Sequence, residues 1–360
     1  MKIKSITFKE FNLKLSEPFS YYTATLECLP YEIITIKTDN EIFGFGEAAL
    51  AWDVTGETQE GALGLFKYIK PLLINHKLNS IEDIKEMMKN IDLNVHENSA
   101  LKSGIEFALL DVLGKFKNKP VYKLLGGKEK EFVVAQRVFP YKEKHSDDLQ
   151  QKITLSLQNG AEIIKFKAGE NSEIDYQIIE KVVNFFPTIK LVLDVNQGWK
   201  NFLNAWPIIK KLEKFKKNIL WIEQPIFSSD YEGLAELSKK SEILIMADES
   251  CHNLLDLKNL YLNKSVKLIN IKLAKCGGIL PAMEMVKFCE EKDIKYMLGD
   301  MINSPLGTAA NLQMATLGNF ISYDLTLNNK IESDPTSGLK IDGYKFYIPQ
   351  TSGIGVSLKN

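Results

Sequence analysis

The sequence predicts an α/β fold, a (β/α)7β-type modified TIM barrel preceded by an α+β capping domain. After residue 125, short apolar segments alternate with helical stretches eight times over about 200 residues, which is typical of such barrels. Before that point, alternating strand segments are followed by a run of helices. A doubly wound open sheet is the alternative. It would need a glycine-rich phosphate turn after its first strand, and residues 135–144 contain none.

The N-terminal block begins with polar and apolar residues alternating over 2–15 and 31–49, which predicts two antiparallel strand segments. Asp39 and Asn40 mark a turn inside the second segment. The aromatic segment between them, residues 16–29, shows no clear period and is predicted to be a loop. Apolar residues spaced three or four apart then predict helices over 61–73, 81–91 and 103–119.

The barrel strands are the short apolar runs of the second block. The eight predicted strands span 132–138, 161–167, 189–195, 219–225, 242–248, 267–273, 294–300 and 320–324. We therefore expect a capping domain over 1–125, a catalytic barrel over 126–328, and a turn-rich tail over 329–360 that packs back on the capping domain.

Composition excludes several classes of function. The net charge of −1 gives no reason to expect a nucleic acid or an anionic membrane as partner. No apolar run approaches the roughly 20 residues of a membrane span. The four cysteines lack any zinc-like spacing and read as reduced thiols of a cytoplasmic protein. These features favour an enzyme that acts on a small molecule.

Three consecutive predicted strands end in an acid: Asp194, Glu223 and Asp248. In a barrel these ends meet at the face that carries the chemistry. Carboxylates so close would repel one another, and a hard divalent cation such as Mg²⁺, which prefers oxygen ligands, removes the conflict. The sequence thus predicts a Mg²⁺ site. The alternative is that these acids cap the helices that follow.

Lysines lie on two sides of this predicted metal site. Lys165 and Lys167 share a face of the second strand, because side chains alternate with period 2, and Lys272 lies in the sixth strand, opposite the second in a closed barrel. One lysine could remove the α-proton of a carboxylate substrate while the other delivers a proton to the opposite face. The base must be neutral, and burial, the metal and the charge of Lys165 favour a lowered pKa for Lys167. Solvated or salt-bridged lysines are the alternative.

The motifs resemble those of the enolase superfamily, muconate-lactonising subgroup, over essentially the whole chain. They are KFKAG (165–169), DVNQGW (194–199), IEQP (222–225), ADES (247–250), NIKLAKCGG (270–278), and in the capping domain FGFGEA (43–48) and the segment 104–127. The resemblance implies Lys167 and Lys272 as the acid/base pair, Lys165 as their binding neighbour, and Mg²⁺ on the three acids. Within the subgroup the chain looks most like the dipeptide epimerases, which invert an α-carbon by two-base 1,1-proton transfer through a metal-stabilised enediolate.

The resemblance also implies substrate contacts. Asp300 lies in a segment that resembles the dipeptide-lining part of the seventh strand. The Asp-x-Asp that grips the α-ammonium in these epimerases is here Asp324 with Thr326, so one acid is missing. The segment 16–29 offers Tyr21 but no cation for a distal carboxylate, which favours a hydrophobic or polar C-terminal residue over glutamate. A homo-oligomer is common in the family and is expected.

Several readings stay open. Arg137, the only arginine of the chain, could clamp a substrate carboxylate or could form a structural ion pair. Other reactions of the subgroup are alternatives to epimerisation: cycloisomerisation, o-succinylbenzoate synthesis and N-acylamino-acid racemisation. A barrel that binds a ligand without catalysis is more remote, since it has no use for opposed lysines.

Overall fold

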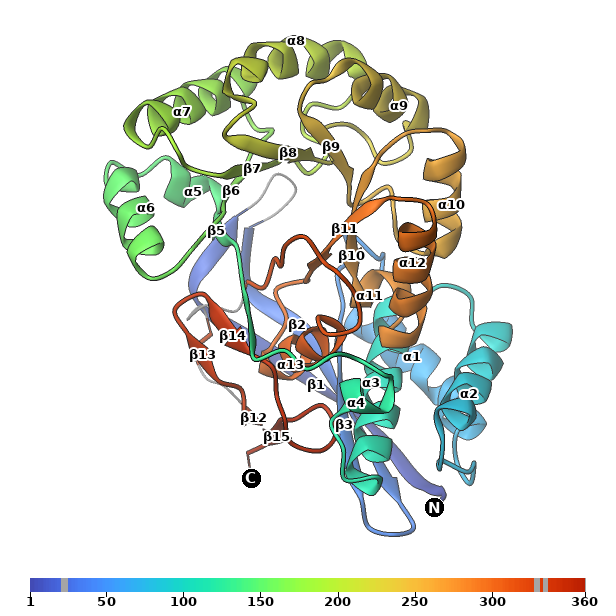
Figure 1. Cartoon of the computed structure of the whole chain (residues 1–360). Helices are drawn as coiled ribbons and strands as arrows, with labels where there is room; N and C mark the ends of the chain where they lie inside the picture. Colours follow the sequence, from blue (N-terminus) through green and yellow to red (C-terminus); the bar gives the residue numbers. More distant parts are fainter. Residues whose placement is uncertain (21–24, 327–330, 333–335, 360) are drawn as a thin grey trace.

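The computed structural model describes residues 1–20, 25–326, 331–332 and 336–359. The N-terminal part is a three-stranded antiparallel sheet in the order β1-β2-β3, packed against helices (Figure 1). Its elements are β1 (Ile3–Ser20), β2 (Thr25–Thr38), β3 (Phe43–Ala49), α1 (Gln59–Ile69), the 3-10 helix η1 (Lys70–Leu72), α2 (Ile81–Asn94), α3 (Ser99–Phe116) and α4 (Val121–Leu124). The predicted helices and the turn after β2 are confirmed.

The prediction of a loop over 16–29 is wrong for its described part. β1 continues to Ser20 and β2 begins at Thr25, and the two remain paired, with Phe19 opposite Leu26. A register shift between Lys14 and Phe19 interrupts the alternation of polar and apolar side chains, which explains why the sequence shows no period there. Residues 21–24, which include the predicted contact Tyr21, lie outside the described residues.

Two glycines of β3 allow α3 to lie directly on the sheet. A Cβ atom on Gly46 would lie 1.9 Å from the carbonyl oxygen of Gly104, and one on Gly44 would lie 2.3 Å from that of Ala108. No side chain fits at such distances, so the FGFG motif is a close-packing device. Helix α3 is consequently buried from Ala100 to Gly114, unlike a one-faced surface helix.

The second part is a curled sheet of seven parallel strands, β5 to β11 in sequence order, with helices around the outside (Figure 1). The strands are β5 (Arg137–Phe139), β6 (Ile164–Lys167), β7 (Leu191–Asp194), β8 (Ile219–Glu223), β9 (Leu244–Ala247), β10 (Leu268–Lys272) and β11 (Lys295–Gly299). The helices are α5 (Tyr141–Lys144), α6 (Leu149–Gln158), α7 (Ser172–Phe185), α8 (Phe202–Leu212) with the 3-10 helix η2 (Glu213–Phe215), α9 (Tyr231–Lys240), α10 (Leu254–Leu262), α11 (Leu273–Cys276), α12 (Ile279–Glu291) and α13 (Pro305–Met314).

The barrel closes without the predicted eighth strand. Where a strand was expected over 320–324, Tyr323 alone makes parallel bridges, to Leu298 of β11 on one side and to Ala135 on the other. The Asp324 amide also donates to the Leu298 carbonyl at 2.8 Å. This segment lacks the length of a strand yet joins the two edges of the sheet, which gives the (β/α)7β-type closure that was predicted.

The predicted first strand, 132–138, divides into two. Its first half, β4 (Phe132–Val134), pairs antiparallel with β14 (Lys345–Tyr347) of the C-terminal tail, whereas Arg137–Phe139 forms β5 and pairs with β6. The chain changes partner at Ala135, whose amide bonds the Tyr344 carbonyl at 2.8 Å. An apolar run alone cannot show such a switch, because both halves are equally apolar.

The C-terminal tail contacts both parts of the molecule. The Ile354 amide donates to Asp111 Oδ1 of α3 at 2.9 Å, and the Val121 amide of α4 donates to the Gly353 carbonyl at 2.9 Å. Its other short strands are β12 (Thr336–Ser337), β13 (Ile341–Asp342) and β15 (Ser357–Leu358). The tail thus bonds to the N-terminal helices and, through β14, to the edge of the barrel.

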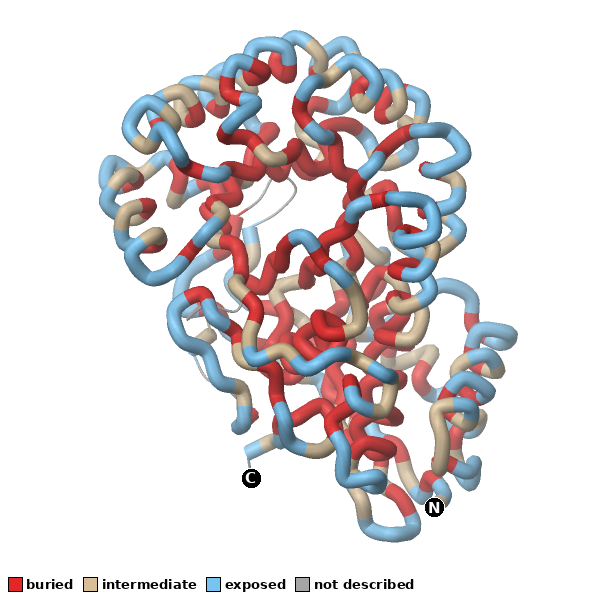
Figure 2. Tube along the Cα trace, viewed as in Figure 1, coloured by how far each residue is buried: buried red, intermediate tan, exposed pale blue. Residues whose placement is uncertain are grey.

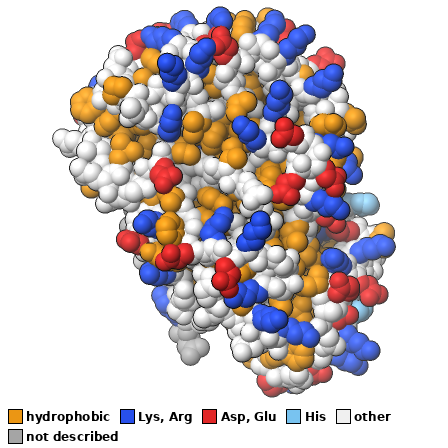
Figure 3. Space-filling model, viewed as in Figure 1, with side chains coloured by type: hydrophobic (Ala, Val, Ile, Leu, Met, Phe, Trp, Pro, Cys, Tyr) orange, Lys and Arg blue, Asp and Glu red, His pale blue; other side chains and the backbone are white. Residues whose placement is uncertain are grey.

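The buried core runs through both parts, and the inner barrel strands are buried almost throughout (Figure 2). A separate apolar cluster takes one residue from each of the strands β7 to β11: Val192, Trp221, Met246, Leu268 and Met297. Val192 lies two residues before Asp194, on the same face of β7, so this plug supports the polar strand ends. On the face of the molecule in Figure 3, lysines and acids are interspersed. Within the described ranges, no helix combines the length and apolarity that crossing a membrane requires.

Two buried glutamates of the N-terminal part bond the first turns of barrel helices. Glu106 of α3 accepts from the Ile279 and Leu280 amides of α12 at 2.6 and 2.9 Å. Glu47 of β3 accepts from the Ser304 amide and the Asn303 side chain ahead of α13. Helix N-termini carry unpaired N–H groups, so each glutamate satisfies donors that would otherwise be buried without partners.

The Glu106 carboxyl predicts a specific pH dependence of stability. Burial raises its pKa from 4.5 to about 8, although the two backbone amides oppose the shift. The folded state therefore holds this proton while the unfolded state releases it, and stability should fall as the pH rises through this interval. In denaturant unfolding experiments between pH 5 and 8, the free energy of unfolding should fall more steeply with pH for the wild type than for Glu106→Gln. Parallel pH profiles would contradict the assignment.

Candidate active site

The parallel register places the key side chains at one level. Lys167 of β6 lies beside Asp194 of β7, which lies beside Glu223 of β8. Asp248 directly follows β9, and Lys272 is the last residue of β10. In the order of the closed sheet, β6 and β10 have β7, β8 and β9 between them. The structure therefore brings the three predicted metal ligands together between the two predicted acid/base lysines.

Lys165 is the centre of this group. Its side chain is 1% exposed, and its ammonium lies 2.9 Å from Asp194 Oδ2, 2.8 Å from Glu223 Oε2 and 2.6 Å from Asp324 Oδ2. Burial would lower its pKa, but Asp194, Asp324 and Glu223 together raise the pKa well above the ordinary value. Lys165 is a permanent cation in this arrangement, consistent with a binding and electrostatic role.

Lys167 contacts the same Asp194 oxygen as Lys165. Its ammonium lies 2.7 Å from Asp194 Oδ2 and 3.1 Å from Asn196 Oδ1. Burial raises the pKa of Asp194, but the two lysines outweigh it and lower the pKa to about 2. The two lysines therefore hold the Asp194 carboxylate in its ionised form.

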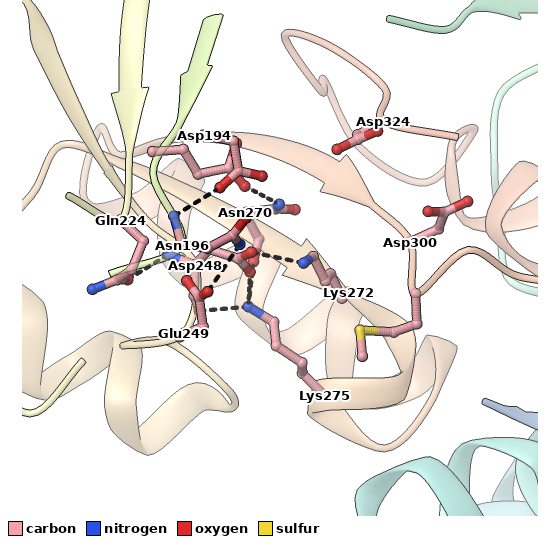
Figure 4. Close-up of polar contacts among 12 residues, drawn as sticks. Asp194, Asn196, Gln224, Asp248, Glu249, Asn270, Lys272, Lys275, Asp300 and Asp324 are labelled. Atoms are coloured by element: carbon pink, nitrogen blue, oxygen red, sulfur yellow. Dashed lines mark hydrogen bonds and ion pairs between the residues drawn. The ribbon is translucent and has the colours of Figure 1, made fainter. Parts of the chain in front are cut away.

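Asp248 is bonded by two lysines (Figure 4). Lys272 Nζ lies 2.7 Å from Asp248 Oδ2, and Lys275 Nζ lies 2.6 Å from Asp248 Oδ1 and also donates to the Asp248 carbonyl. Burial lowers and Asp248 raises the pKa of Lys272, with a net upward shift. Lys275 is fully buried and fixes one carboxylate oxygen of Asp248, which orients the other toward Lys272.

Three polar residues of the site were not predicted. Asn270 donates to Glu223 Oε1 at 2.8 Å, and Asn196 donates to Glu249 Oε1 at 3.0 Å. The period of a strand could have indicated Asn270, which lies two residues before Lys272 and so shares its face. Glu249 is adjacent to Asp248 in sequence but gives no strand-based signal, because it lies beyond the end of β9.

Carboxyl groups outnumber ammonium groups around these strand ends. Four ammonium groups, of Lys165, Lys167, Lys272 and Lys275, are placed among six carboxyl groups, of Asp194, Glu223, Asp248, Glu249, Asp300 and Asp324. The surplus appears in the pKa values: burial and then Asp194 raise the pKa of Glu223 to about 8, and burial and then Asp248 raise that of Glu249 to about 7. The site therefore holds more carboxyl groups than its lysines can pair with, and the excess is held partly as protonated acid, which a bound cation would allow to ionise.

The donor set fits a divalent cation. As they stand, no three Asp, Glu, His or Cys side chains in the described part of the chain converge closely enough to hold a metal, because lysine ammonium groups lie between the acids. Glu223 is fully buried, and the Lys165 ammonium at 2.8 Å is the described partner of its Oε2. Carboxylate oxygens are what Mg²⁺ prefers, and a charge of +2 would offset the surplus. Asp194, Glu223 and Asp248 would hold it.

Asp324 and Asp300 form a second acidic corner of the pocket (Figure 4). Asp324 gives one oxygen to Lys165, while its Oδ1 is buried without a hydrogen-bond partner in the described structure. Thr326 donates its hydroxyl to Asp300 Oδ1 and its amide to Asp300 Oδ2, both at 2.8 Å. Burial and then Asp324 raise the pKa of Asp300 to about 6. Thr326 therefore orients the Asp300 carboxyl through these two bonds. Asp300, and not the Thr326 hydroxyl, is the main acceptor that this pair offers to a ligand.

Arg137 does not join this group. Its guanidinium forms an ion pair with Glu143 and lies 4.2 Å over the ring of Phe139, and the residue is absent from the pocket lining. The structural ion pair, which the sequence left open, is the interaction that the structure describes. The proposed substrate contact of Arg137 is therefore not supported by its position.

The remaining walls of the pocket come largely from the N-terminal part and are mostly apolar. They include Phe19, Leu26, Leu29, Trp52 and Val54. Met301 and Ile302, after β11, add to them, and the Tyr31 hydroxyl bonds the Ile302 carbonyl. No cationic side chain from residues 16–20 or 25–58 lines the described pocket. A substrate group directed toward these walls would meet apolar surface.

Comparisons with known proteins cover the whole chain. Residues 148–360 match the family "Enolase C-terminal domain-like", and residues 3–126 match "Mandelate racemase / muconate lactonizing enzyme, N-terminal domain". The chain is 30% identical to an N-succinyl-L-Arg/Lys racemase of Bacillus cereus, over 99% of this chain and 96% of that protein. It is 31% identical to a hydrophobic dipeptide epimerase of Enterococcus faecalis, over 99% of this chain and 100% of that protein.

A crystal structure of a dipeptide epimerase from Enterococcus faecalis, complexed with Mg and the dipeptide L-Leu-L-Tyr, has the same fold. The TM-score is 0.91 at 30% identity, and the match covers 99% of this chain and 100% of that one. The fold is thus that of enzymes that act on amino acid derivatives.

Metal binding should be measurable without any substrate. Millimolar Mg²⁺ should raise the Tm of the wild type, because a ligand that binds the folded state at a hundredfold excess over its Kd adds about 2.7 kcal/mol. Glu223→Gln keeps the size and the bond from Asn270 but should abolish the rise. Asp342→Asn on the exposed strand β13 is the matched control and should behave as wild type. An equal rise in Glu223→Gln would refute the assignment.

Proposed function

This chain belongs to the mandelate racemase / muconate lactonizing enzyme family of the enolase superfamily, and from that membership we propose that it is a Mg²⁺-dependent dipeptide epimerase. The family relation makes it an isomerase of the racemase and epimerase type, acting on amino acid derivatives. The observation that carries the finer proposal is the placement of Lys167 and Lys272. They end strands on opposite sides of three buried carboxylates, in a pocket that also has unneutralised acid for an ammonium group.

The reaction is a proton transfer at the α-carbon of the dipeptide's C-terminal residue. When bound, Mg²⁺ supplies a Lewis acid for the substrate carboxylate. Lys167 or Lys272, as the neutral amine, takes the α-proton from its side, and the opposite lysine, as ammonium, delivers a proton to the other face. Lys165 remains charged throughout and stabilises the negative charge that develops on the carboxylate. After one turnover the two lysines have exchanged protonation states, and proton exchange with solvent, once the product has left, returns each to its starting form.

The free amino end of the dipeptide is assigned to Asp324 and Asp300. The unpartnered Oδ1 of Asp324 can accept a charge-assisted bond from an ammonium. Asp300, held by Thr326, supplies the second carboxylate that a Thr at position 326 would otherwise leave missing. Ammonium recognition therefore uses acids from two segments of the barrel.

The C-terminal side chain is assigned to the apolar wall formed by Phe19, Leu26 and Trp52. A hydrophobic residue gains from burial there, whereas glutamate would bring a charge that no lining cation compensates. The hydrophobic dipeptide epimerase of Enterococcus faecalis supports the same class of substrate. We thus propose hydrophobic or broad specificity, with glutamate disfavoured.

The second candidate is an N-acylamino-acid racemase, which the similarity to the N-succinyl-L-Arg/Lys racemase favours. An N-acylated substrate has no α-ammonium for Asp324 and brings the carboxylate or amide of its acyl group instead. The acidic corner of the pocket speaks against that substrate. Arg137, which could have bound a succinyl carboxylate, is engaged by Glu143.

Alanine variants test the two lysines. Lys167→Ala and Lys272→Ala should each lower the rate of dipeptide epimerisation by at least about 10³-fold, because each removes one of the two proton carriers. Chiral chromatography of the products from a dipeptide library measures this rate. Both variants should retain the Mg²⁺-dependent rise in Tm. Lys190→Ala, an exposed lysine near the opposite end of β7, is the control. Full activity in either site variant would remove the mechanism.

The ammonium assignment separates the two candidate functions. Asp324→Asn should reduce kcat/KM for hydrophobic dipeptides by about 10- to 100-fold, since a bond to a charged group contributes about 1.5–3 kcal/mol. The matched control is the N-succinyl form of the same C-terminal residue, whose poor turnover should not fall further. Equal losses for both substrates would mean that Asp324 acts through Lys165 instead. Preferred turnover of the N-succinyl compound by the wild type would favour the second candidate.

A further inference from the structure

Three backbone polar groups at the end of β6, from two consecutive peptide bonds, are held by side chains from two helices. The Lys167 carbonyl accepts from Lys144 Nζ at 2.7 Å, the Ala168 carbonyl accepts from the Tyr141 hydroxyl, and the Gly169 amide donates to Asp175 Oδ2 at 2.8 Å. Lys144 and Tyr141 belong to α5, and Asp175 belongs to the first turn of α7. The peptide bonds 167–168 and 168–169 of this exit segment thus each have a side-chain partner.

Lys144 and Asp175 also bind each other. The Lys144 ammonium lies 2.5 Å from Asp175 Oδ1 and 4.4 Å from the centre of the Tyr141 ring. Their side chains are 2% and 5% exposed. Burying a charge pair carries a desolvation penalty that only good geometry and further hydrogen bonds offset. A neutral donor could satisfy the Lys167 carbonyl without that penalty. The need to pair this carbonyl therefore does not by itself explain a buried ion pair at this position.

The exit segment is also pressed against the next strand end. Gly169 has a φ of +108°, and a Cβ atom there would lie 2.6 Å from the Val195 carbonyl oxygen. Val195 follows Asp194, whose carboxylate contacts the Lys167 ammonium. The backbone on one side of Lys167 and the side-chain partner on the other are therefore fixed relative to each other.

Among the described residues, no comparable set of side chains holds the backbone that follows the opposite lysine. Lys272 is followed directly by the short helix α11, for which it is the N-cap residue, and its own side chain is held by Asp248. The Lys275 ammonium bonds the Asn270 carbonyl and Asp248, not the Lys272 carbonyl. The set formed by Lys144, Asp175 and Tyr141 thus holds the backbone at only one of the two proposed proton carriers, Lys167.

We propose that Lys144, Asp175 and Tyr141 are positioning residues for Lys167: they fix the backbone at its carbonyl so that its amine meets the α-carbon from one face. The inference rests on the two-base function proposed above, and it assigns these three residues no contact with substrate. A misplacement of about 1 Å in a reacting group can lower a rate by about 10²-fold. Removing these backbone contacts should therefore slow proton transfer by Lys167 and leave proton transfer by Lys272 unchanged.

Deuterium exchange separates the two lysines. In D₂O a lysine that takes the α-proton becomes an ammonium carrying solvent deuterons, and it can return one of them to the same face without inversion. The probes are L-Leu-L-Tyr and L-Leu-D-Tyr, or the most active epimer pair of a dipeptide library. Lys167→Ala identifies the epimer whose exchange depends on Lys167, and Lys272→Ala identifies the other.

Lys144→Met and Tyr141→Phe are the test variants. The double variant Lys144→Met/Asp175→Asn removes both buried charges and guards against misfolding of the single one. Lys152→Met, which breaks the ion pair of Lys152 with Asp148 on the neighbouring helix α6, is the matched control. Circular dichroism and the Mg²⁺-dependent rise in Tm establish that each variant is folded and binds metal.

Lys144→Met and the double variant should slow exchange of the Lys167-dependent epimer about 10- to 100-fold more than exchange of the other epimer, and Tyr141→Phe should show a smaller effect in the same direction. Lys152→Met should slow neither. Equal slowing of both epimers, or no slowing in any folded variant, would overturn the inference. Absence of exchange in the wild type would overturn the proposed function instead, so the two failures are distinguishable.

Discussion

The buried ammonium of Lys165 is the interaction on which the site depends. It bonds carboxylates from β7, from β8 and from the segment that closes the barrel. Asp324, which follows the bridging residue Tyr323, ties that closing segment to the centre of the sheet. Removing one partner of a buried ion pair costs about 3–5 kcal/mol, so closure and site geometry depend on the same charge. The neighbouring Lys167 shares the Asp194 Oδ2 atom with Lys165.

The N-terminal part is bonded to the barrel and supplies walls of the pocket. Glu47 and Glu106 bond the starts of α13 and α12, and the glycines of β3 allow α3 to approach the sheet closely. These contacts hold β1 and β2 over the strand ends, where Phe19 and Leu26 line the pocket. The chemistry thus resides in rigid strands, whereas the side-chain preference resides in the capping hairpin. This division allows one proton-transfer apparatus to serve different substrates within a family.

Much of this organisation can be predicted from the sequence, because strand period and strand order are local properties. Lys165 and Lys167 share a face by alternation, and the acids of β7 and β8 end apolar runs. Apart from the hairpin around residues 16–29, where a register shift hides the period, the failures occur where the partner is distant in sequence. The split of the predicted first strand depends on β14, and the reduced eighth strand depends on two flanking edges. Thr326 likewise changes meaning once Asp300, from another segment, is placed beside it.

The central claim is that the substrate α-carbon lies between two lysines from opposite sides of the barrel. The most direct measurement is a crystal structure with Mg²⁺ and a hydrophobic dipeptide bound. The account predicts the ammonium or amine of Lys167 on one face of the α-carbon and that of Lys272 on the other, each within about 3–3.5 Å, with the metal on Asp194, Glu223 and Asp248. Both lysines on one face, or an α-carbon out of reach of either, would contradict it.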